Sequence, residues 1–128
     1  MRALLDTHAL LWWLDGDERL SGPARAWVGE QSHAVLVSAA SAWEIATKAR
    51  IGKLPGATEV VENFHACMTD QGFTPLSITA DHALRAGSLP GPHHDPFDRL
   101  LIAQALAENI PLISNETLFD GYGVRRIW

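Results

Sequence analysis

Four acidic residues stand out because each follows an apolar strand-like segment or lies in the apolar part of a helix-like segment. They are Asp6, Glu44, Asp98 and Glu116. Carboxylates brought close together repel one another, which raises their pKa values or requires a cation between them. Mg²⁺ and Mn²⁺ prefer such oxygen ligands, and these ions activate water and neutralise phosphate in phosphodiester hydrolysis. If the fold gathers these residues, the sequence predicts a metal-dependent hydrolase.

Each acid also has a purely structural explanation. Asp6 and Glu116 are placed to cap helices, and Asp95-Pro96-Phe97-Asp98 has the pattern of an N-cap followed by an acid in the first turn. Ser41 and Glu44 have the spacing of a capping box. A helix that begins near residue 38, however, puts Glu44 in its second turn, which is too deep for capping.

Short apolar strands alternating with helices must position these acids. The pattern predicts strands at residues 2–5, 34–37, 73–77, 111–114 and 124–128, and helices at 8–14, 21–31, 38–51, 57–70, 79–87 and 95–108. This alternation indicates βαβ units and therefore an α/β fold, a three-layer α/β/α sandwich with a central parallel sheet. In such sheets ligands bind beyond the carboxyl ends of the strands, where Asp6 and Glu116 are expected.

Composition limits the class of protein. The 128 residues suit one domain, expected over residues 1–128, and a net charge of −5 excludes a protein that holds nucleic acid only through a basic surface. Cys67 is the single cysteine, so no intramolecular disulfide can form, which favours a reducing cytoplasm. No apolar run approaches the roughly 20 residues needed to cross a bilayer, so we expect no membrane partner.

Several segments, in the same order along nearly the whole chain, resemble those of PIN-domain ribonucleases of the VapC toxin type. They are residues 4–8, 38–45, 94–105, 112–116 and 122–124, with Trp128 at the end. The first segment alone carries little information. Trp43-Glu44 and Asp95-Pro96-Phe97-Asp98-Arg99 together are specific to this family.

The resemblance implies a PIN-like fold and a metal-dependent endoribonuclease that uses Mg²⁺ or Mn²⁺. It also implies the toxin of a type II toxin–antitoxin pair, which cleaves RNA and inhibits translation. The partners implied are a cognate antitoxin protein, an RNA substrate and a second copy of the chain in a homodimer.

The same resemblance assigns the catalytic and metal-binding acids. It places them at Asp6, Glu44, Asp98 and Glu116, with Thr7, Asp95 and Ser114 as auxiliary residues. The family more often has Asp at the last acidic position. The longer Glu116 could withdraw from direct ligation, with Asp95 compensating, so one or two metal ions are both compatible with this sequence.

Four basic residues near the acids are expected to contact RNA phosphates. They are Lys48, Arg50, Lys53 and Arg99. A solvated face near a helix C-terminus is the alternative for the first three, and an ion pair with a neighbouring acid is the alternative for Arg99. His93-His94, in a loop close to Asp95, is expected to be a solvated pair, with contact to substrate or metal as the alternative. A tryptophan of Trp12-Trp13 left outside the core would favour a protein interface.

Two other functions stay open. A receiver-like Mg²⁺-binding module would need adjacent acids after the first strand and a lysine after the last, but Thr7-His8 follows Asp6 and no lysine follows Lys53. A phosphotransferase of the haloacid dehalogenase type would need an acid at His8. The second open function is a catalytically weak PIN-like scaffold that acts through protein partners.

Overall fold

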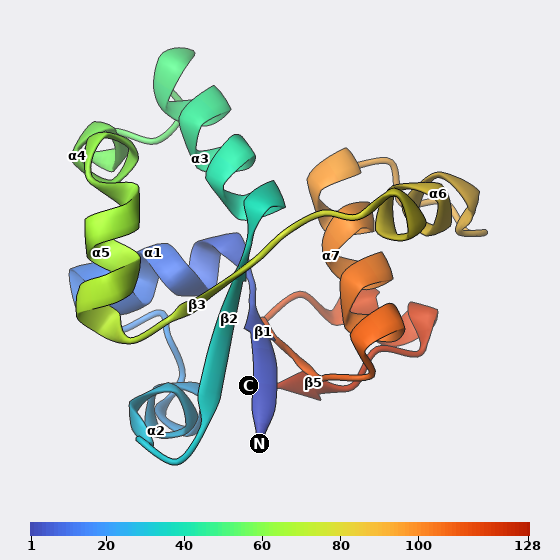
Figure 1. The fold of residues 1–128 in the computed structure, drawn as a ribbon, viewed down its shortest axis with the longest axis horizontal. Helices are drawn as coiled ribbons and strands as arrows, with labels where there is room; N and C mark the ends of the chain where they lie inside the picture. The colour runs from blue at the N-terminus through green and yellow to red at the C-terminus, as the bar shows by residue number, and fades with distance from the viewer.

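A five-stranded sheet forms the middle of the molecule in the computed structural model, which describes residues 1–128 (Figure 1). Its strands are β1 (Arg2–Leu5), β2 (Ala34–Ser38), β3 (Thr74–Leu76), β4 (Leu112–Ile113) and β5 (Arg126–Ile127). They lie in the order β3-β2-β1-β4-β5, and every pairing is parallel. The predicted α/β/α sandwich is therefore confirmed.

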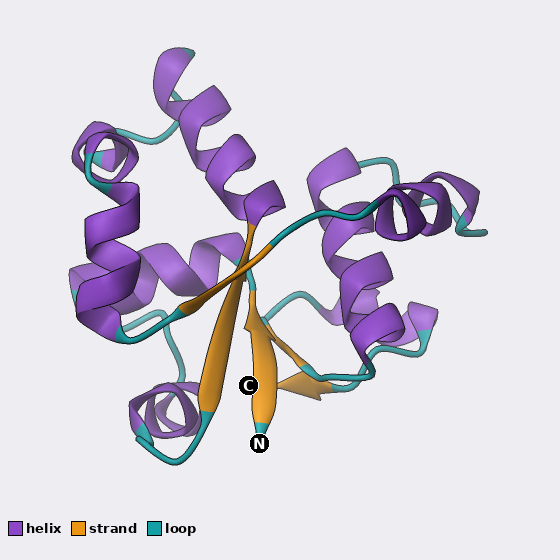
Figure 2. Cartoon of the chain, in the orientation of Figure 1, coloured by secondary structure: helices purple, strands orange, loops and turns teal.

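Helices cover both faces of the sheet (Figure 2). One layer consists of α1 (Thr7–Asp15), α2 (Gly22–Gly29), α4 (Ala57–Glu62) and α5 (Phe64–Gln71). The other consists of α6 (Ala80–Ser88), α7 (Pro96–Glu108) and the 3₁₀ helix η1 (Thr117–Tyr122). Helix α3 (Ala39–Arg50) continues from β2 beyond the edge of the sheet (Figure 1). None of these helices is long and apolar enough to cross a membrane.

Alternation of side chains along the strands produces two separate cores. Leu5 and Val37 point into the core beneath α1, α2 and α5, whereas their neighbours Leu4 and Leu36 point into the core beneath α7. Successive strand residues face opposite sides of a sheet, so a strand that is apolar at every position must be buried on both faces. This explains why the strands lack an alternating polar pattern.

The predicted single helix over residues 57–70 is wrong. The structure has two helices there, α4 and α5, with Asn63 at their junction. Both the backbone N–H and the side-chain amide of Asn63 donate to the carbonyl of Glu59, each at 3.1 Å. The side chain shares this carbonyl with its own backbone N–H, and the Asn63 backbone, with φ −121° and ψ 26°, leaves helical geometry and separates the two helices.

Polar residues cap the helices that begin at the carboxyl edge of the sheet. Asp6 caps α1, Ser38 caps α3, and Glu116 caps η1 directly after β4. Asp95 caps α7, whose first turn reaches the same region. Parallel strands place their carboxyl ends on one edge, so helix N-termini and their acids gather there.

Candidate metal centre

Asp6 lies at the end of β1, where its buried carboxylate caps α1. Its Oδ1 accepts a hydrogen bond of 2.7 Å from the backbone N–H of His8, and its Oδ2 accepts one of 2.6 Å from the hydroxyl of Ser114. Burial raises the pKa of Asp6 above its ordinary value, the two hydrogen bonds oppose this rise, and the charge of Glu44 adds to it. Asp6 is thus a helix cap and also an acid whose charged form a cation would stabilise.

Glu44 lies in the second turn of α3 with 3% of its surface exposed. The helix is capped by Ser38, whose hydroxyl accepts the N–H of Ala40 at 2.9 Å, so the capping-box explanation through Ser41 is wrong. The carboxylate of Glu44 instead accepts a hydrogen bond from the ammonium group of Lys48. Burial lowers the pKa of Lys48, but the hydrogen bond and charge of Glu44 outweigh burial and leave that pKa raised.

Asp98 lies in the first turn of α7. Asp95 caps this turn by accepting two of its backbone N–H groups, at 2.9 and 3.2 Å. The Oδ2 atom of Asp98 lies 2.8 Å from Nε2 of His93. Burial raises the pKa of Asp98 to about 6, the contact with His93 opposes the rise, and the charges of Asp95, Asp6 and Glu44 add to it.

Asp6, Glu44 and Asp98 therefore lie near enough for their charges to act on one another, although they belong to three different elements. The charge of Glu44 acts on both aspartates, and the charge of Asp6 acts on Asp98. No three His, Cys, Asp or Glu side chains already surround one metal position. Each carboxylate is engaged by its own partner, which is Ser114, Lys48 or His93. Binding of a cation here would compete with these contacts.

Glu116 joins this region through its backbone. Its N–H donates to Oγ of Ser114 at 2.9 Å, whereas its carboxylate accepts the N–H of Leu118 at 3.1 Å and caps η1. In this orientation Glu116 is a helix cap, the structural explanation that the sequence also allowed. The hydroxyl of Thr7 donates to Ser41 at 2.9 Å, so its hydrogen bond ties α1 to α3 and does not orient one of the candidate acids.

The three basic residues on or after α3 differ in their surroundings. Lys48 is half-buried against Glu44, at the acidic centre itself. Arg50 and Lys53 are exposed at and beyond the end of α3. Lys48 therefore lies nearest to the acids, and the other two extend the positive charge away from them.

Arg99 binds backbone carbonyls instead of the neighbouring acid that the ion-pair alternative requires. Its guanidinium donates to the carbonyls of Ala86 and His93, each at 2.9 Å, and to that of Leu89. Arg99 forms no ion pair, and three of its five N–H donors bind backbone carbonyls, so its contact with RNA stays a prediction. Arg99 instead fastens the segment between α6 and α7 to the first turn of α7.

The contact of His93 with Asp98 was not predicted, since the His93-His94 pair is expected in solvent. His94 is exposed, as expected, but the ring of His93 is turned inward. The available signal was the position of His93 in a Pro- and Gly-rich loop that must fold back onto the helix carrying Asp98. Such a loop brings nearby residues close to the N-terminus of that helix.

Trp12 and Trp13 are both half-buried against the core, so neither is left outside. Trp43, beside Glu44, is the tryptophan that faces solvent, with 55% of its surface exposed. Its ring packs edge-on against Phe97, with ring centroids 4.8 Å apart. An aromatic pair therefore borders the acidic centre between α3 and α7.

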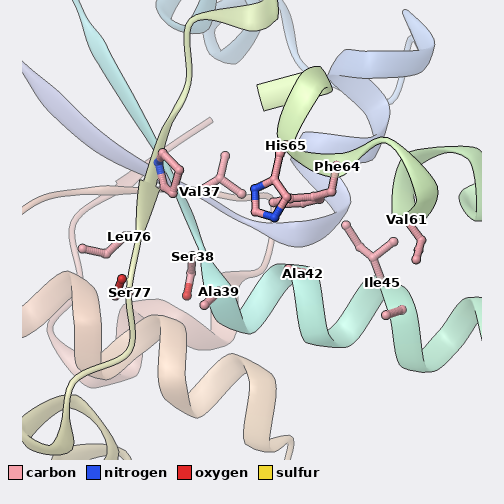
Figure 3. A pocket seen from close by; sticks show the side chains of 12 residues that line it. Val37, Ser38, Ala39, Ala42, Ile45, Val61, Phe64, His65, Leu76 and Ser77 are labelled. Atoms are coloured by element: carbon pink, nitrogen blue, oxygen red, sulfur yellow. The ribbon is translucent and has the colours of Figure 1, made fainter. Parts of the chain in front are cut away.

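A separate hollow of about 410 Å³ lies between α3, β3 and the α4–α5 pair (Figure 3). Ala42 and Ile45 line it from α3, and Phe64 and His65 line it from α5. The helical period places Glu44 on another face of α3, and none of the candidate acids lines this hollow. It is a mostly apolar cavity that is separate from the acidic centre.

Comparison with known proteins gives matches at the levels of family, sequence and fold. Residues 3–124 match the sequence model of the PIN domain. Ribonuclease VapC16 of Mycobacterium tuberculosis is 44% identical over 63 residues, which cover 46% of this chain and 40% of that protein. The match thus spans about two fifths of the length of that relative.

Two solved structures share the fold over nearly the full chain. VapBC2 from Rickettsia felis, bound to a DNA fragment from its promoter, has a TM-score of 0.71 at 14% identity and covers 100% of both chains. VapC20 from Mycobacterium tuberculosis, a toxin that cleaves the sarcin–ricin loop, has a TM-score of 0.68 at 17% identity and covers 95% of each chain. These similarities confirm the arrangement of strands and helices.

Proposed function

This chain belongs to the PIN domain family, and we propose that it is a metal-dependent endoribonuclease that acts as the toxin of a toxin–antitoxin pair. It would hydrolyse phosphodiester bonds in RNA and thereby inhibit translation. The single observation that carries the proposal is that Asp6, Glu44 and Asp98, near the carboxyl ends of the strands, lie close enough for their charges to act on one another. Part of the sequence is 44% identical to a ribonuclease, which supports the same activity.

Mg²⁺ or Mn²⁺ is the cofactor that fits this donor set. The converging side chains are carboxylates, the hard oxygen ligands that these ions prefer. Burial raises the pKa values of Asp6 and Asp98, and mutual repulsion adds to the rise, so their charged forms need further positive charge. Asp6 and Asp98 would hold the ion, and Glu44 would bind it directly or through water. A divalent cation there supplies water activation and neutralises the phosphate.

Other residues of the chain would support the acids. Ser114 orients the carboxylate of Asp6, and Lys48 balances the buried charge of Glu44 while the metal is absent. Glu116 uses one carboxylate oxygen to cap η1, so we place it beside the centre, where it would assist the other acids. Arg50 and Lys53 would contact RNA phosphates away from the metal.

The proposed partners are RNA, an antitoxin protein and a second copy of the chain. The fold shared with VapBC2 supports an antitoxin partner. The exposed Trp43, held against Phe97, supplies an aromatic surface suited to a homodimer interface. A single unpaired cysteine, Cys67, fits action in the reducing cytoplasm.

Changing Asp6 or Asp98 to Asn tests the proposal, because the amide keeps the size of the side chain and removes its charge. Cleavage of RNA in Mg²⁺ or Mn²⁺ should fall by about two orders of magnitude or more while the circular dichroism spectrum is retained. Asp81→Asn is the matched control, since Asp81 is an exposed acid in the first turn of α6.

Each outcome of this experiment has a definite meaning. Undiminished cleavage by Asp6→Asn or Asp98→Asn would overturn the assignment of these acids. A folded wild-type protein that cleaves no RNA with either ion would replace the nuclease with a module that acts only through protein partners.

A further inference from the structure

A hollow of about 630 Å³ lies directly beside the acidic centre, between the loop of residues 89–93 and η1. The side chains of Pro90, Pro92, His93, Leu118 and Tyr122 contribute to its wall. His93 links the hollow to the acidic centre, because it lines the hollow and its Nε2 atom lies 2.8 Å from the Asp98 carboxylate. A molecule bound at the acids could therefore extend into this hollow without leaving the surface.

The loop that forms one wall is held in place from two sides. Arg99 binds carbonyls of Leu89 and His93, and the hydroxyl of Tyr122 accepts the N–H of His93 at 3.1 Å. Gly91 has a φ of 103°, and a Cβ atom built there would lie 2.7 Å from the hydroxyl oxygen of Tyr122. Only glycine allows the loop this close, so the wall is preformed rather than assembled on binding.

The wall is also chemically suited to a flat ring. The phenol ring of Tyr122, the imidazole of His93 and the pyrrolidine rings of two prolines are rigid, and Leu118 adds an apolar rim that is 55% exposed. The hydroxyl of Tyr122 accepts one hydrogen bond and keeps its own proton, which it can donate to a ring nitrogen or carbonyl. The volume lies within the range of about 300–1,000 Å³ usual for small-molecule sites.

We propose that this hollow binds one unpaired nucleobase of the RNA, next to the phosphodiester bond cleaved at the acidic centre. Proteins read single-stranded RNA by stacking splayed bases on aromatic and other flat side chains. The proposal rests on the proposed ribonuclease activity, because it assigns the hollow to the same substrate. It adds a place where the identity of a base next to the cleaved bond can be read.

Binding to the metal-free protein tests the hollow without any cleavage. The full chain, labelled with ¹⁵N and kept in EDTA, is titrated with the four nucleoside monophosphates and, separately, with ribose 5-phosphate. We expect saturable shifts of the amides of Gly91, His93, Leu118 and Gly121 with at least one nucleotide. Ribose 5-phosphate, which lacks a base, should leave these amides unshifted.

Leu118→Asn is the variant for this titration, because Leu118 is exposed and its replacement adds no charge that would repel phosphate. It should weaken nucleotide binding at least about fivefold, the low end of what one stacked base contributes. Leu84→Asn is the matched control, since Leu84 is 69% exposed on α6 and does not line the hollow. Equal binding by both variants overturns the proposal, as do equal shifts with ribose 5-phosphate or no shifts at all.

A cleavage experiment separates failure of the hollow from failure of the proposed function. In a short single-stranded RNA that the wild-type protein cleaves, an abasic nucleotide replaces each nucleotide flanking the cleaved bond in turn. One replacement should slow the wild type at least about fivefold and slow Leu118→Asn much less, because the contact is already lost.

Equal slowing of both proteins overturns the base site and leaves the ribonuclease intact. If the wild type cleaves no RNA, the ribonuclease proposal fails. The nucleotide titration then still decides whether the hollow binds a base.

Discussion

The hydroxyl of Ser114 donates a hydrogen bond of 2.6 Å to Oδ2 of Asp6, a residue 108 positions away in the chain. The contact follows from the register of the sheet. Leu5 pairs with Ile113, so the next residues on the two parallel strands leave the sheet side by side. Ser114 thus fixes one oxygen of Asp6 and lowers the pKa that burial raises.

Ser114→Ala should therefore weaken metal binding at this centre. Without the hydroxyl, Asp6 is less firmly oriented and its pKa rises further, so fewer molecules present the charged form at neutral pH. Loss of such a supporting hydrogen bond typically costs about 10- to 100-fold in metal affinity. Calorimetric titration with Mn²⁺ measures it, with Ser88→Ala at the exposed end of α6 as control. Equal Mn²⁺ affinity in the wild type and Ser114→Ala would remove Asp6 from the metal site.

The stability of the metal-free protein should depend on pH through Asp98. Its pKa in the folded protein is about 6, above the ordinary 3.8, so the folded state holds this proton more tightly than the unfolded chain. The stability from this proton is complete below about pH 4 and is lost as pH rises through about 6. Partial exposure limits the effect to about 1–2 kcal/mol.

Urea unfolding in EDTA across this range measures the effect as the difference between the wild type and Asp98→Asn. The variant should gain relative stability as pH rises from about 4 to 7, because it carries no charge to bury. Stability differences that stay constant with pH would contradict the raised pKa. Subtracting the two profiles cancels the opposite contributions of Asp17 and Asp120, whose pKa values hydrogen bonds to arginines lower.

Lys48→Gln should lower the stability of the metal-free protein and increase the stabilisation that metal provides. Glu44 is buried, and Lys48 is the cation that pairs with it, so the variant leaves a buried carboxylate without a counter-ion. A divalent cation then becomes the main source of positive charge. At one fixed Mn²⁺ concentration the tighter binder gains more, about 2.7 kcal/mol where that concentration is about 100 times the Kd.

Melting temperatures with and without Mn²⁺ compare Lys48→Gln with the exposed control Lys53→Gln. The gain on adding Mn²⁺ should be larger in Lys48→Gln than in the wild type. An equal gain in all three proteins would show that Glu44 does not take part in metal binding.

The fold and the nearness of three acids could be predicted because both follow from local patterns. Apolar strands and capped helices fix the parallel sheet, and a parallel sheet brings its strand ends to one edge. The rule that strand ends gather at one edge is enough to predict the position of Asp6, at the end of the first strand. Glu44 was distinguished from a capping residue by its depth in the helix, which the structure confirms with Ser38 as the N-cap.

What could not be predicted depends on side-chain direction and on loops. Whether Glu116 points to the acids or to its own helix is a choice of rotamer, and the N–H of Leu118 decides it here. The position of His93 depends on how a Pro- and Gly-rich loop folds back onto α7. A loop conformation has no repeating sequence pattern from which it could be predicted. Asn63 separates α4 from α5 through its backbone conformation, which an apolar periodicity does not register.

Arg99→Ala should loosen the loop of residues 89–95 and lower the free energy of unfolding by about 2 kcal/mol. The guanidinium holds three backbone carbonyls together, and a hydrogen bond to a charged group contributes about 1.5–3 kcal/mol. In Arg99→Ala water can bind the freed carbonyls, so the total loss is smaller than the sum of the three bonds. Urea unfolding measures stability, and limited proteolysis measures opening of the loop. Arg85→Ala, an exposed arginine on α6, is the control.

A second substitution at this position, Arg99→Lys, separates a loop clamp from a phosphate contact. If Arg99 is a clamp, Arg99→Lys should lower stability nearly as much as Arg99→Ala does. A lysine ammonium lacks the planar guanidinium fork that reaches three carbonyls at once. A phosphate contact predicts that Arg99→Lys retains RNA affinity, and that Arg99→Ala lowers its salt dependence by about one ion while stability is unchanged. Wild-type stability and protease resistance in Arg99→Ala, with weaker and less salt-dependent RNA binding, would assign Arg99 to the substrate surface after all.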